Sequence, residues 1–285
     1  MTGRLSFLTV STQGCPRAPA QPGAPVLDAL PVAPAVRSRC WPGDQRGHLG
    51  AFRAAGWAQW APPILEQPRF AARKPRCGRD SLRAMKIYGH PASTCTRKVL
   101  MALNETHTPF ELSVVDFAKG EHKQPAHIAH QPFGQVPALD DEGFEMYESR
   151  AMARYIDGKA GGQLSPKEAH ARAIMEQWIS IETSNFSAHA MKFIYHTVFR
   201  REQAPEVLKT AGTALDLAYQ TMDKQLSAQP FLAGNEFTLA DVCFAPYLEY
   251  LTLTPAAGKL AEHKNVEKWW AAVSSRPAWQ KTIGR

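Results

Sequence analysis

The chain has 285 residues, a formal net charge of +7 and a hydrophobic fraction of 44%, a length that allows one large domain or two smaller ones. No run approaches the roughly eighteen consecutive apolar residues that a transmembrane helix needs, so we expect no membrane-spanning helix. The five cysteines are too few and too scattered for a disulfide framework. None of them forms a C-x-x-C pair that would indicate zinc.

The positive charge is confined to the first third of the chain. Residues 1–84 contain 12 Lys or Arg against 4 Asp or Glu, whereas residues 85–285 contain 21 against 22. The larger part therefore has no excess of basic residues, and we predict no nucleic-acid partner for it.

Residues 1–84 also contain 11 of the 22 prolines and show no sustained period of 2 or 3.6. Proline lacks an amide donor and fixes φ, so this composition predicts a disordered leader. Three interpretations stay open: a tail translated upstream of a start at Met85, an Arg-rich transit peptide that would direct the protein to an organelle, and a nucleic-acid-binding arm. The first is favoured, because Ser enrichment and an amphipathic helix are not evident and the arginines are dispersed.

From Met85 the pattern alternates between strands and helices. The predicted elements are a strand at 86–89, a helix through 96–103, a strand at 110–115, a helical stretch at 121–130, two strands at 136–139 and 144–147, and a helix at 149–156. The order βαβ-α-ββα predicts a small mixed sheet with helices on both faces.

The rest of the chain is helical by pattern. Residues 159–166 form a linker by composition, and helices are predicted over 167–201, 205–227, from 238, over 265–275 and after 277. Thr238 and Asp241 have the spacing of a capping box at the start of the third helix. We therefore assign these two residues a structural role, without chemistry.

Four ordered segments carry a family resemblance: GHPAST at 89–94, GEHK at 120–123, HQPFGQVP at 130–137 and YESRA at 147–151. Residues 85–285 resemble the cytosolic glutathione transferases, and the motifs resemble those of the phi class. The resemblance implies an α/β thioredoxin-like N-terminal domain at 85–158, a linker at 159–166, and an all-α C-terminal domain at 167–285 that contains the pocket for the electrophile.

The implied chemistry is the activation of a thiol. A free thiol has a pKa of about 8.5, so only a few per cent is nucleophilic thiolate at neutral pH. Lowering that pKa by about two units stabilises the thiolate by roughly 2.7 kcal/mol. Ser93 is placed to do this, because its hydroxyl can donate to sulfur and the helix that begins beside it contributes its positive end. A plain N-cap is the alternative role.

The resemblance implies contacts for each part of glutathione. Val136 would pair with the cysteinyl backbone, and the peptide bond between Val136 and Pro137 would be cis. Glu148 and Ser149 would bind the γ-glutamyl group. The glycyl carboxylate would be bound by His122, Lys123 and Gln135. Candidate walls of the electrophile pocket are Phe186, Tyr195 and Tyr250. The chain has Ser187 after Phe186, where phi-like proteins often have a proline, which leaves the pocket shape open.

We therefore expect a glutathione transferase that conjugates glutathione to small hydrophobic electrophiles and also reduces organic hydroperoxides. The alternatives are a non-catalytic ligand carrier on the same fold and a thiol transferase that uses Cys95, although Cys95 should be buried because it lies about 200° from Ser93 around the helix. The family implies a cytoplasmic homodimer that uses glutathione as a co-substrate, without a metal or other cofactor.

Overall fold

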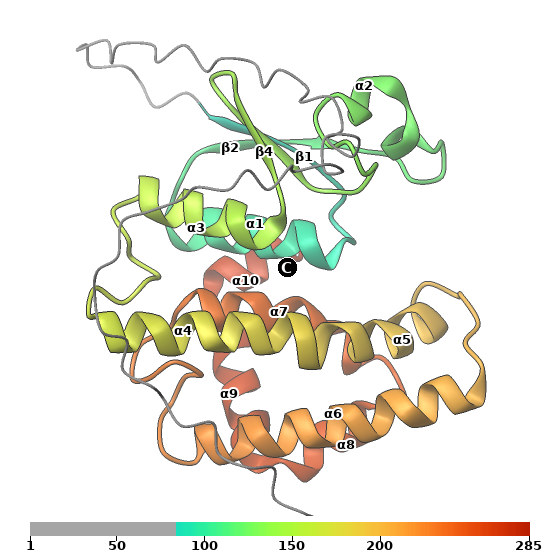
Figure 1. Ribbon diagram of the computed structural model, residues 1–285, viewed down its shortest axis with the longest axis vertical. Coiled ribbons are helices and arrows are strands. Elements are labelled where there is room, and N and C mark those ends of the chain that lie inside the picture. The colour runs from blue at the N-terminus through green and yellow to red at the C-terminus, as the bar shows by residue number, and fades with distance from the viewer. Residues whose placement is uncertain (1–83) are drawn as a thin grey trace, which may run out of the picture. The chain divides into compact units, whose positions relative to one another are not determined.

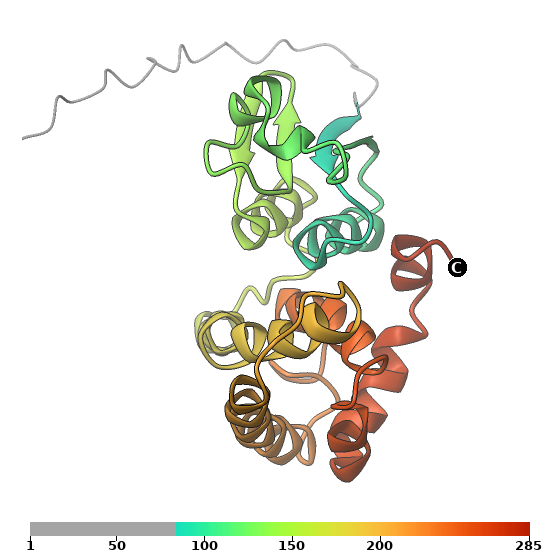
Figure 2. The same cartoon turned by 90° about the vertical axis from the view of Figure 1, so that its right-hand side faces the viewer.

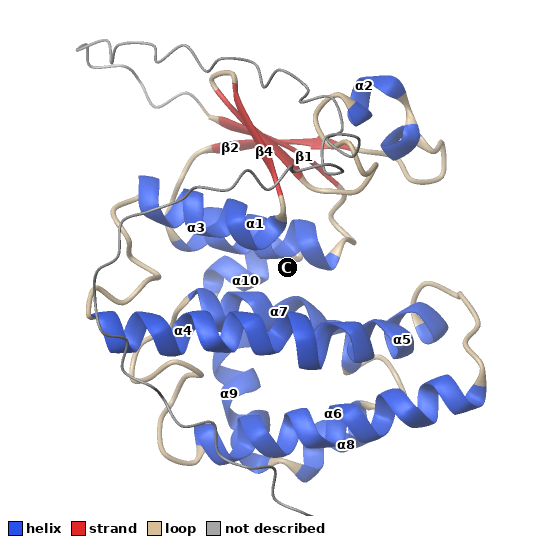
Figure 3. Cartoon of the chain, in the orientation of Figure 1, coloured by secondary structure: helices blue, strands red, loops and turns tan. Residues whose placement is uncertain are grey.

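The computed structural model describes residues 84–285, so the predictions about the leader lie, apart from its last residue, outside the described residues. Strands are confined to the N-terminal part of this range, and the remainder is helical (Figure 3). The N-terminal elements are β1 (Met85–Gly89), α1 (Thr94–Glu105), β2 (Phe110–Val114), the 3₁₀ turn η1 (Glu121–Lys123), α2 (Pro125–Ile128), β3 (Ala138–Asp141), β4 (Phe144–Tyr147) and α3 (Ser149–Lys159).

These elements form one four-stranded mixed sheet with the order β2-β1-β3-β4. β1 and β2 are parallel, whereas β1–β3 and β3–β4 are antiparallel. α1 and α3 pack against each other and lie together beside the sheet (Figure 1). The predicted βαβ-α-ββα order is confirmed, but the helix expected over 121–130 is a 3₁₀ turn followed by a single turn of α-helix.

The C-terminal elements are all helical. They are α4 (Ala169–Ile181), the π-helical turn η2 (Glu182–Ser187), α5 (Ala188–Thr197), α6 (Pro205–Leu226), α7 (Leu239–Leu251), α8 (Ala257–Glu262), α9 (Lys264–Ser274) and α10 (Pro277–Thr282). The long helix predicted over 167–201 is thus interrupted by η2, a feature that hydrophobic periodicity does not detect. Among the described residues, no helix is long and apolar enough to cross a bilayer.

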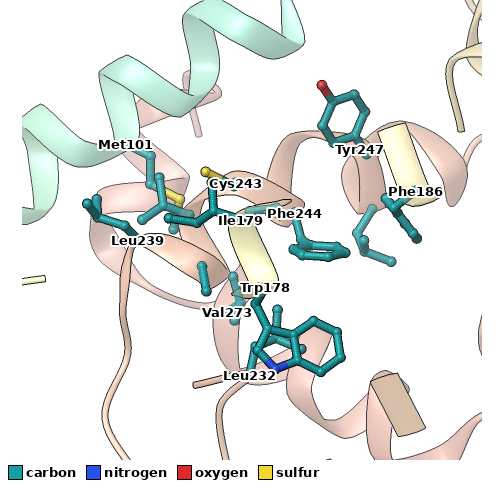
Figure 4. Packing of buried hydrophobic residues seen from close by; sticks show 14 of the residues in the cluster. Met101, Trp178, Ile179, Phe186, Leu232, Leu239, Cys243, Phe244, Tyr247 and Val273 are labelled. Atoms are coloured by element: carbon teal, nitrogen blue, oxygen red, sulfur yellow. The ribbon is translucent and has the colours of Figure 1, made fainter. Parts of the chain in front are cut away.

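α1 joins the two halves of the described chain. It packs against α3 on one side and against α7 and α10 on another, and its residues 98–104 are all buried. Figure 4 shows Met101 of α1 close to Leu239 and Cys243 of α7, in the same apolar cluster as Trp178 of α4. The sheet and the helical elements therefore share one continuous hydrophobic core rather than two separate ones.

α7 is the central helix of that core, because every residue from Leu239 to Leu251 is buried. Its start has the capping box that the sequence predicts: Thr238 accepts from a backbone N–H, and the Asp241 carboxylate accepts from the Thr238 N–H at 2.9 Å. Asp241 also accepts hydrogen bonds from the Leu232 N–H at 3.0 Å and the Trp269 indole at 2.8 Å. The carboxylate thus connects the loop before α7 to α9 as well as capping the helix.

Candidate functional site

Three loops meet at one end of the sheet. Tyr88 of β1 is paired with Ala138 of β3, and Ala138 is paired with Tyr147 of β4. The segments that follow β1, precede β3 and follow β4 are therefore neighbours. The sequence-predicted residues on these segments are Ser93, Gln135, Val136, Glu148 and Ser149.

Ser93 is the N-cap of α1 and is half-buried. Its Oγ accepts a hydrogen bond from the Thr96 N–H at 3.3 Å. Because this bond uses an oxygen lone pair, the Ser93 O–H stays free to donate to a ligand. The first turn of α1 adds the positive end of the helix dipole beside it. Capping and donation to sulfur are therefore compatible roles for the same hydroxyl.

The loop that carries Ser93 is fixed by short-range contacts. A Cβ on Gly89 would lie 2.7 Å from a Thr96 side-chain carbon, so only glycine allows β1 to end this close to α1. The Ala92 N–H donates to the His90 ring at 3.1 Å, and the Tyr250 hydroxyl donates to the Ala92 carbonyl at 2.7 Å. The position of Ser93 is thus set both by its own loop and by α7.

The loop before β3 is organised by two buried side chains that the sequence analysis did not single out. The Gln131 amide oxygen accepts from the N–H groups of Phe133 at 2.7 Å and Gln135 at 3.2 Å. His127 Nε2 donates to the Gln135 carbonyl at 2.6 Å. Gln131 lies within the motif at 130–137 but was given no role there, and His127 lies in the stretch whose only sequence signal was helix propensity.

Val136 follows directly and precedes a cis peptide bond to Pro137, as the resemblance implies. The side chain of Val136 is half-buried. Within residues 84–285, no hydrogen bond engages its N–H or its C=O. An extended peptide could therefore pair with this backbone in the manner of an added strand.

Glu148 and Ser149 form the turn from β4 into α3. Glu148 has φ 74° and ψ 99°, a conformation that a non-glycine residue adopts at a cost of about 1–3 kcal/mol and that is concentrated at functional sites. The Glu148 side chain is exposed, and Ser149 is buried as the first residue of α3. The exposed carboxylate and the N-terminal N–H groups of the helix can together bind an ammonium and a carboxylate.

His122 and Lys123 lie on η1, which packs against the loop before β3. Lys123 Nζ donates to the Phe133 carbonyl at 3.1 Å, and a Cβ on Gly134 would come within 2.8 Å of the His122 carbonyl. The His122 ring contacts Phe117 edge-on at 5.1 Å. Its Nδ1 is buried without a hydrogen-bond partner in the described part of the chain, as expected for an atom that awaits a ligand.

A buried ion cluster connects α1 and α3, the two helices that begin at the candidate site, to the C-terminal helical elements. Arg150 of α3 forms two hydrogen bonds with Glu182, at 2.6 and 2.8 Å, and Lys98 of α1 lies 3.4 Å from the same carboxylate. Lys98 also donates to the Tyr247 hydroxyl at 2.9 Å. The interaction with Tyr247 and Glu182 raises the pKa of Lys98 in spite of burial. Glu182 thereby fixes α1 and α3 relative to each other, a role that the sequence did not reveal.

The prediction that Phe186 forms a wall of the electrophile pocket is wrong. It has no exposed surface, and it packs in the helical core against Tyr219 and Phe244, where it cannot line a pocket (Figure 4).

Tyr195 and Tyr250 do lie near each other through Phe199, which contacts Tyr195 at 6.1 Å and Tyr250 at 5.6 Å. Tyr195 and Phe199 are half-buried, whereas Tyr250 is 6% exposed. Because the Tyr250 hydroxyl also contacts the Ser93 loop, this aromatic cluster adjoins the Ser93 site. Phe199 was not predicted, although its spacing of four residues from Tyr195 on a helical pattern was a usable signal.

The two described cysteines differ from each other. Cys243 is buried, as predicted, and burial raises its pKa to about 12. Cys95 is half-buried rather than fully buried as predicted, although its neighbours Thr94 and Thr96 in the first turn of α1 are buried. In residues 84–285, no group of three or more His, Cys, Asp or Glu is placed to hold a metal ion.

A four-stranded βαβ-α-ββα sheet that carries a serine at the start of its first helix, joined to a helical bundle, defines a thioredoxin-like domain with an all-α partner. The comparisons with known proteins agree. Residues 83–158 match the family model described as glutathione S-transferase, N-terminal domain, and residues 186–277 match the one for the C-terminal domain. The chain belongs to the glutathione S-transferase family.

Individual relatives show which class of this family the chain resembles. Glutathione S-transferase F11 of Arabidopsis thaliana is 34% identical over 207 residues, which cover 70% of this chain and 97% of that protein. Glutathione S-transferase 3 of Zea mays is 38% identical, with 70% and 93% covered. The crystal structure of glutathione transferase F2 from Populus trichocarpa has a TM-score of 0.67 at 33% identity, with 70% and 97% covered. The chain is thus an enzyme of this family, and the predicted phi-class resemblance is confirmed.

Proposed function

We propose that the enzyme binds glutathione at the end of the sheet and that the Ser93 hydroxyl donates a hydrogen bond to its sulfur. The observation that carries this proposal is the geometry of Ser93: its oxygen accepts from the Thr96 N–H, so its hydrogen is available to a thiolate. The N-terminus of α1 would stabilise the same negative charge. The thiolate then attacks an electrophilic carbon, and the leaving group departs with its electron pair.

The remaining parts of glutathione fit the neighbouring loops. The free N–H and C=O of Val136 would pair with the cysteinyl backbone. Glu148 would accept from the γ-glutamyl ammonium, while Ser149 and the start of α3 would bind the α-carboxylate. His122, Lys123 and Gln135 would bind the glycyl carboxylate. The unpartnered Nδ1 of His122 supports that assignment, because a buried polar atom costs free energy until it forms a hydrogen bond.

The second substrate would bind beside the aromatic cluster of Tyr195, Phe199 and Tyr250. Aromatic faces favour apolar, planar groups, so we propose small hydrophobic electrophiles, with organic hydroperoxides as a further substrate class. No metal or other cofactor takes part in this proposal, since the polarising groups are a hydroxyl and a helix terminus. The domain limits 85–158, 159–166 and 167–285 are retained as proposals.

We further propose a homodimer in the cytoplasm. Phe133 is 63% exposed and contacts Tyr147, which is 37% exposed, and Phe144 is 39% exposed on the same hairpin. Clustered exposed aromatic side chains are typical of protein interfaces. Sedimentation analysis of Phe133→Ser against the unsubstituted chain tests this, and an unchanged dimer fraction would contradict it.

One alternative activity rests on a specific observation. Cys95 is half-exposed on the first turn of α1, so it could form a mixed disulfide with glutathione and act as a thiol transferase. In that reaction the Cys95 thiolate attacks the glutathione sulfur of a mixed disulfide, and the other thiol leaves as thiolate. A second glutathione thiolate then attacks the glutathione sulfur bound to Cys95, which releases glutathione disulfide and restores the Cys95 thiolate.

Steady-state kinetics on two single variants separate these activities. Conjugation to a chromogenic aryl halide is measured for Ser93→Ala and Cys95→Ser, with the exposed Ser180→Ala as a control for serine removal. We expect Ser93→Ala to lose about 25-fold in kcat/KM at pH 7, because the thiolate fraction of bound glutathione falls from about three quarters to a few per cent when the thiol pKa rises by about two units. The other two variants are expected to keep full activity. Full activity in Ser93→Ala would refute the role of Ser93. Reduction of a mixed disulfide between glutathione and a small thiol is measured on the same proteins, and a rate that is lost in Cys95→Ser but kept in Ser93→Ala would favour the thiol transferase.

A further inference from the structure

His90 begins the turn that leads to Ser93, and the proposed function gives it no role. α1 lies between the sheet and the C-terminal helices (Figure 2), and the turn before it is contacted from both sides. Phe117, from the loop after β2, stacks on the His90 ring with 4.9 Å between ring centroids. Tyr250 of α7 donates to the Ala92 carbonyl at 2.7 Å. An electrophile that binds beside the aromatic cluster of Tyr250 therefore lies near the His90 turn.

The hydrogen bond of the His90 ring shows which of its nitrogens carries the hydrogen. The Ala92 N–H donates to His90 Nδ1 at 3.1 Å, and a backbone N–H can only donate, so Nδ1 is the acceptor. The hydrogen of the neutral ring then lies on Nε2. Within residues 84–285, no hydrogen bond engages Nε2. His90 thus carries an N–H donor that no described residue uses.

This donor belongs to the same short turn as the Ser93 hydroxyl. The Ser93 N–H donates to the His90 carbonyl at 2.8 Å. Such a bond closes a β-turn, whose two end residues lie within about 7 Å of each other between Cα atoms. The His90 N–H donates to the Thr96 hydroxyl at 3.3 Å, which holds the start of the turn to α1. The turn therefore has an imidazole donor at one end and a hydroxyl donor at the other.

The imidazole is held in place before any substrate binds. The bond from Ala92 fixes Nδ1, and Phe117 stacks on one face of the ring at an interplanar angle of 27°. Phe117 is in turn contacted edge-on by His122, with 5.1 Å between ring centroids. A donor whose direction is fixed in advance needs no reorganisation during a reaction, which is the condition for effective stabilisation of an oxyanion.

Two donors near one thiolate can serve different atoms of the reaction. Ser93 is assigned to the sulfur, whose negative charge disappears as the new bond forms. That charge moves into the electrophile, and in an α,β-unsaturated carbonyl compound it moves onto the carbonyl oxygen, a few bonds from the attacked carbon. A neutral imidazole N–H can stabilise such an oxygen without giving up its proton.

We propose that His90 Nε2 donates a hydrogen bond to this oxygen and thereby makes α,β-unsaturated carbonyl compounds favoured second substrates. The inference rests on the proposed function, because it takes the glutathione thiolate to lie at Ser93. The sulfur forms a bond to the β-carbon, the C=C electron pair becomes that of the enolate, and the carbonyl π pair moves onto oxygen. The enolate accepts the bond from His90, and the proton that the thiol lost to water returns from water to the α-carbon.

The test compares two electrophiles that share a phenyl ring, on the full chain with saturating glutathione. Benzalacetone is an α,β-unsaturated ketone, whereas benzyl chloride has no oxygen and its charge departs with chloride. The variant is His90→Asn, because an asparagine oxygen can accept from the N–H two residues further on, as Nδ1 does here. Its amide N–H groups lie closer to the backbone than Nε2 does. The variant therefore keeps the turn and removes the donor.

We expect the ratio of kcat/KM for benzalacetone to kcat/KM for benzyl chloride to fall about tenfold in His90→Asn, the effect of one lost hydrogen bond to a charged oxygen. His170→Asn removes an exposed histidine at the start of α4 and is the control, which should leave the ratio unchanged. The thiol of bound glutathione should titrate alike in His90→Asn and in the unsubstituted chain, because Ser93 stays in place.

Equal losses with the two electrophiles in His90→Asn would overturn the inference, since a displaced Ser93 turn slows both reactions alike. An unchanged ratio would also overturn it. Turnover of benzyl chloride by the variant reports that the protein is folded and that the thiolate is still formed. If the unsubstituted chain turned over neither electrophile, the proposed function itself would be contradicted, and the inference about His90 with it.

Discussion

Two regions along α1 show two ways of building a charged site: the loops at its N-terminus, and the buried ion cluster around Lys98. At its N-terminus, Ser93, Val136 and Glu148 present polar groups on loops that no other described side chain satisfies. Four residues into the helix, Lys98 is fully buried and paired with Glu182 and Tyr247. The first region retains unused hydrogen-bonding capacity, as a ligand site must. The second region uses its hydrogen-bonding capacity for contacts that fix the helices. The comparison indicates that the reactive region at the N-terminus of α1 depends on the rigid ion cluster further along the same helix.

The ion cluster around Lys98 should be disrupted most severely by a substitution at Glu182. Glu182→Gln leaves Lys98 and Arg150 as buried cations without a charged partner, so we expect the free energy of unfolding to fall by about 3–5 kcal/mol. Urea denaturation of the full chain measures this.

The matched control for Glu182 is a surface ion pair. Glu267 lies 3.0 Å from Lys264, and both side chains are exposed. Glu267→Gln is expected to change the unfolding free energy by less than about 1 kcal/mol. Equal losses in the two variants would show that burial of the cluster contributes nothing to its stabilising effect.

The ligand-binding region can be weakened at Gln131. Gln131→Ala removes the acceptor for the N–H groups of Phe133 and Gln135. Each unsatisfied group costs about 1–3 kcal/mol, and here the cost falls on the loop that precedes Val136. We expect KM for glutathione to rise about tenfold or more, with kcat changed less. A loss confined to kcat would place Gln131 elsewhere in the mechanism.

Tyr250→Phe tests the contact between α7 and the Ser93 loop and should have the smallest effect. It removes a single hydrogen bond, from the tyrosine hydroxyl to the Ala92 carbonyl, while the ring stays in place. The expected loss is about 1 kcal/mol or less, which corresponds to a few-fold decrease in kcat/KM. If stability falls and kcat/KM does not, α7 supports the fold but does not position the Ser93 loop.

Local sequence patterns explain why the order of the elements and several candidate site residues could be predicted. Ser93, Val136, Glu148 and the capping box of α7 are recognised within motifs of a few residues, and the alternation of patterns predicts the order of strands and helices along the chain. The Lys98–Glu182 pair joins residues 84 positions apart, and Asn104–Thr282 joins residues 178 apart. No local pattern encodes such pairs. Phe186 was misassigned for the same reason, since its burial depends on contacts with Tyr219 and Phe244, which lie 33 and 58 residues further along the chain.

The most direct test of the account is the pKa of the thiol of bound glutathione, followed by the ultraviolet absorbance of the thiolate as a function of pH. We predict that the enzyme lowers this pKa by about two units from the free value of about 8.5, and that Ser93→Ala returns it most of the way. Equal pKa values on the two proteins, with glutathione bound to both, would contradict the claim that the Ser93 hydroxyl stabilises the thiolate.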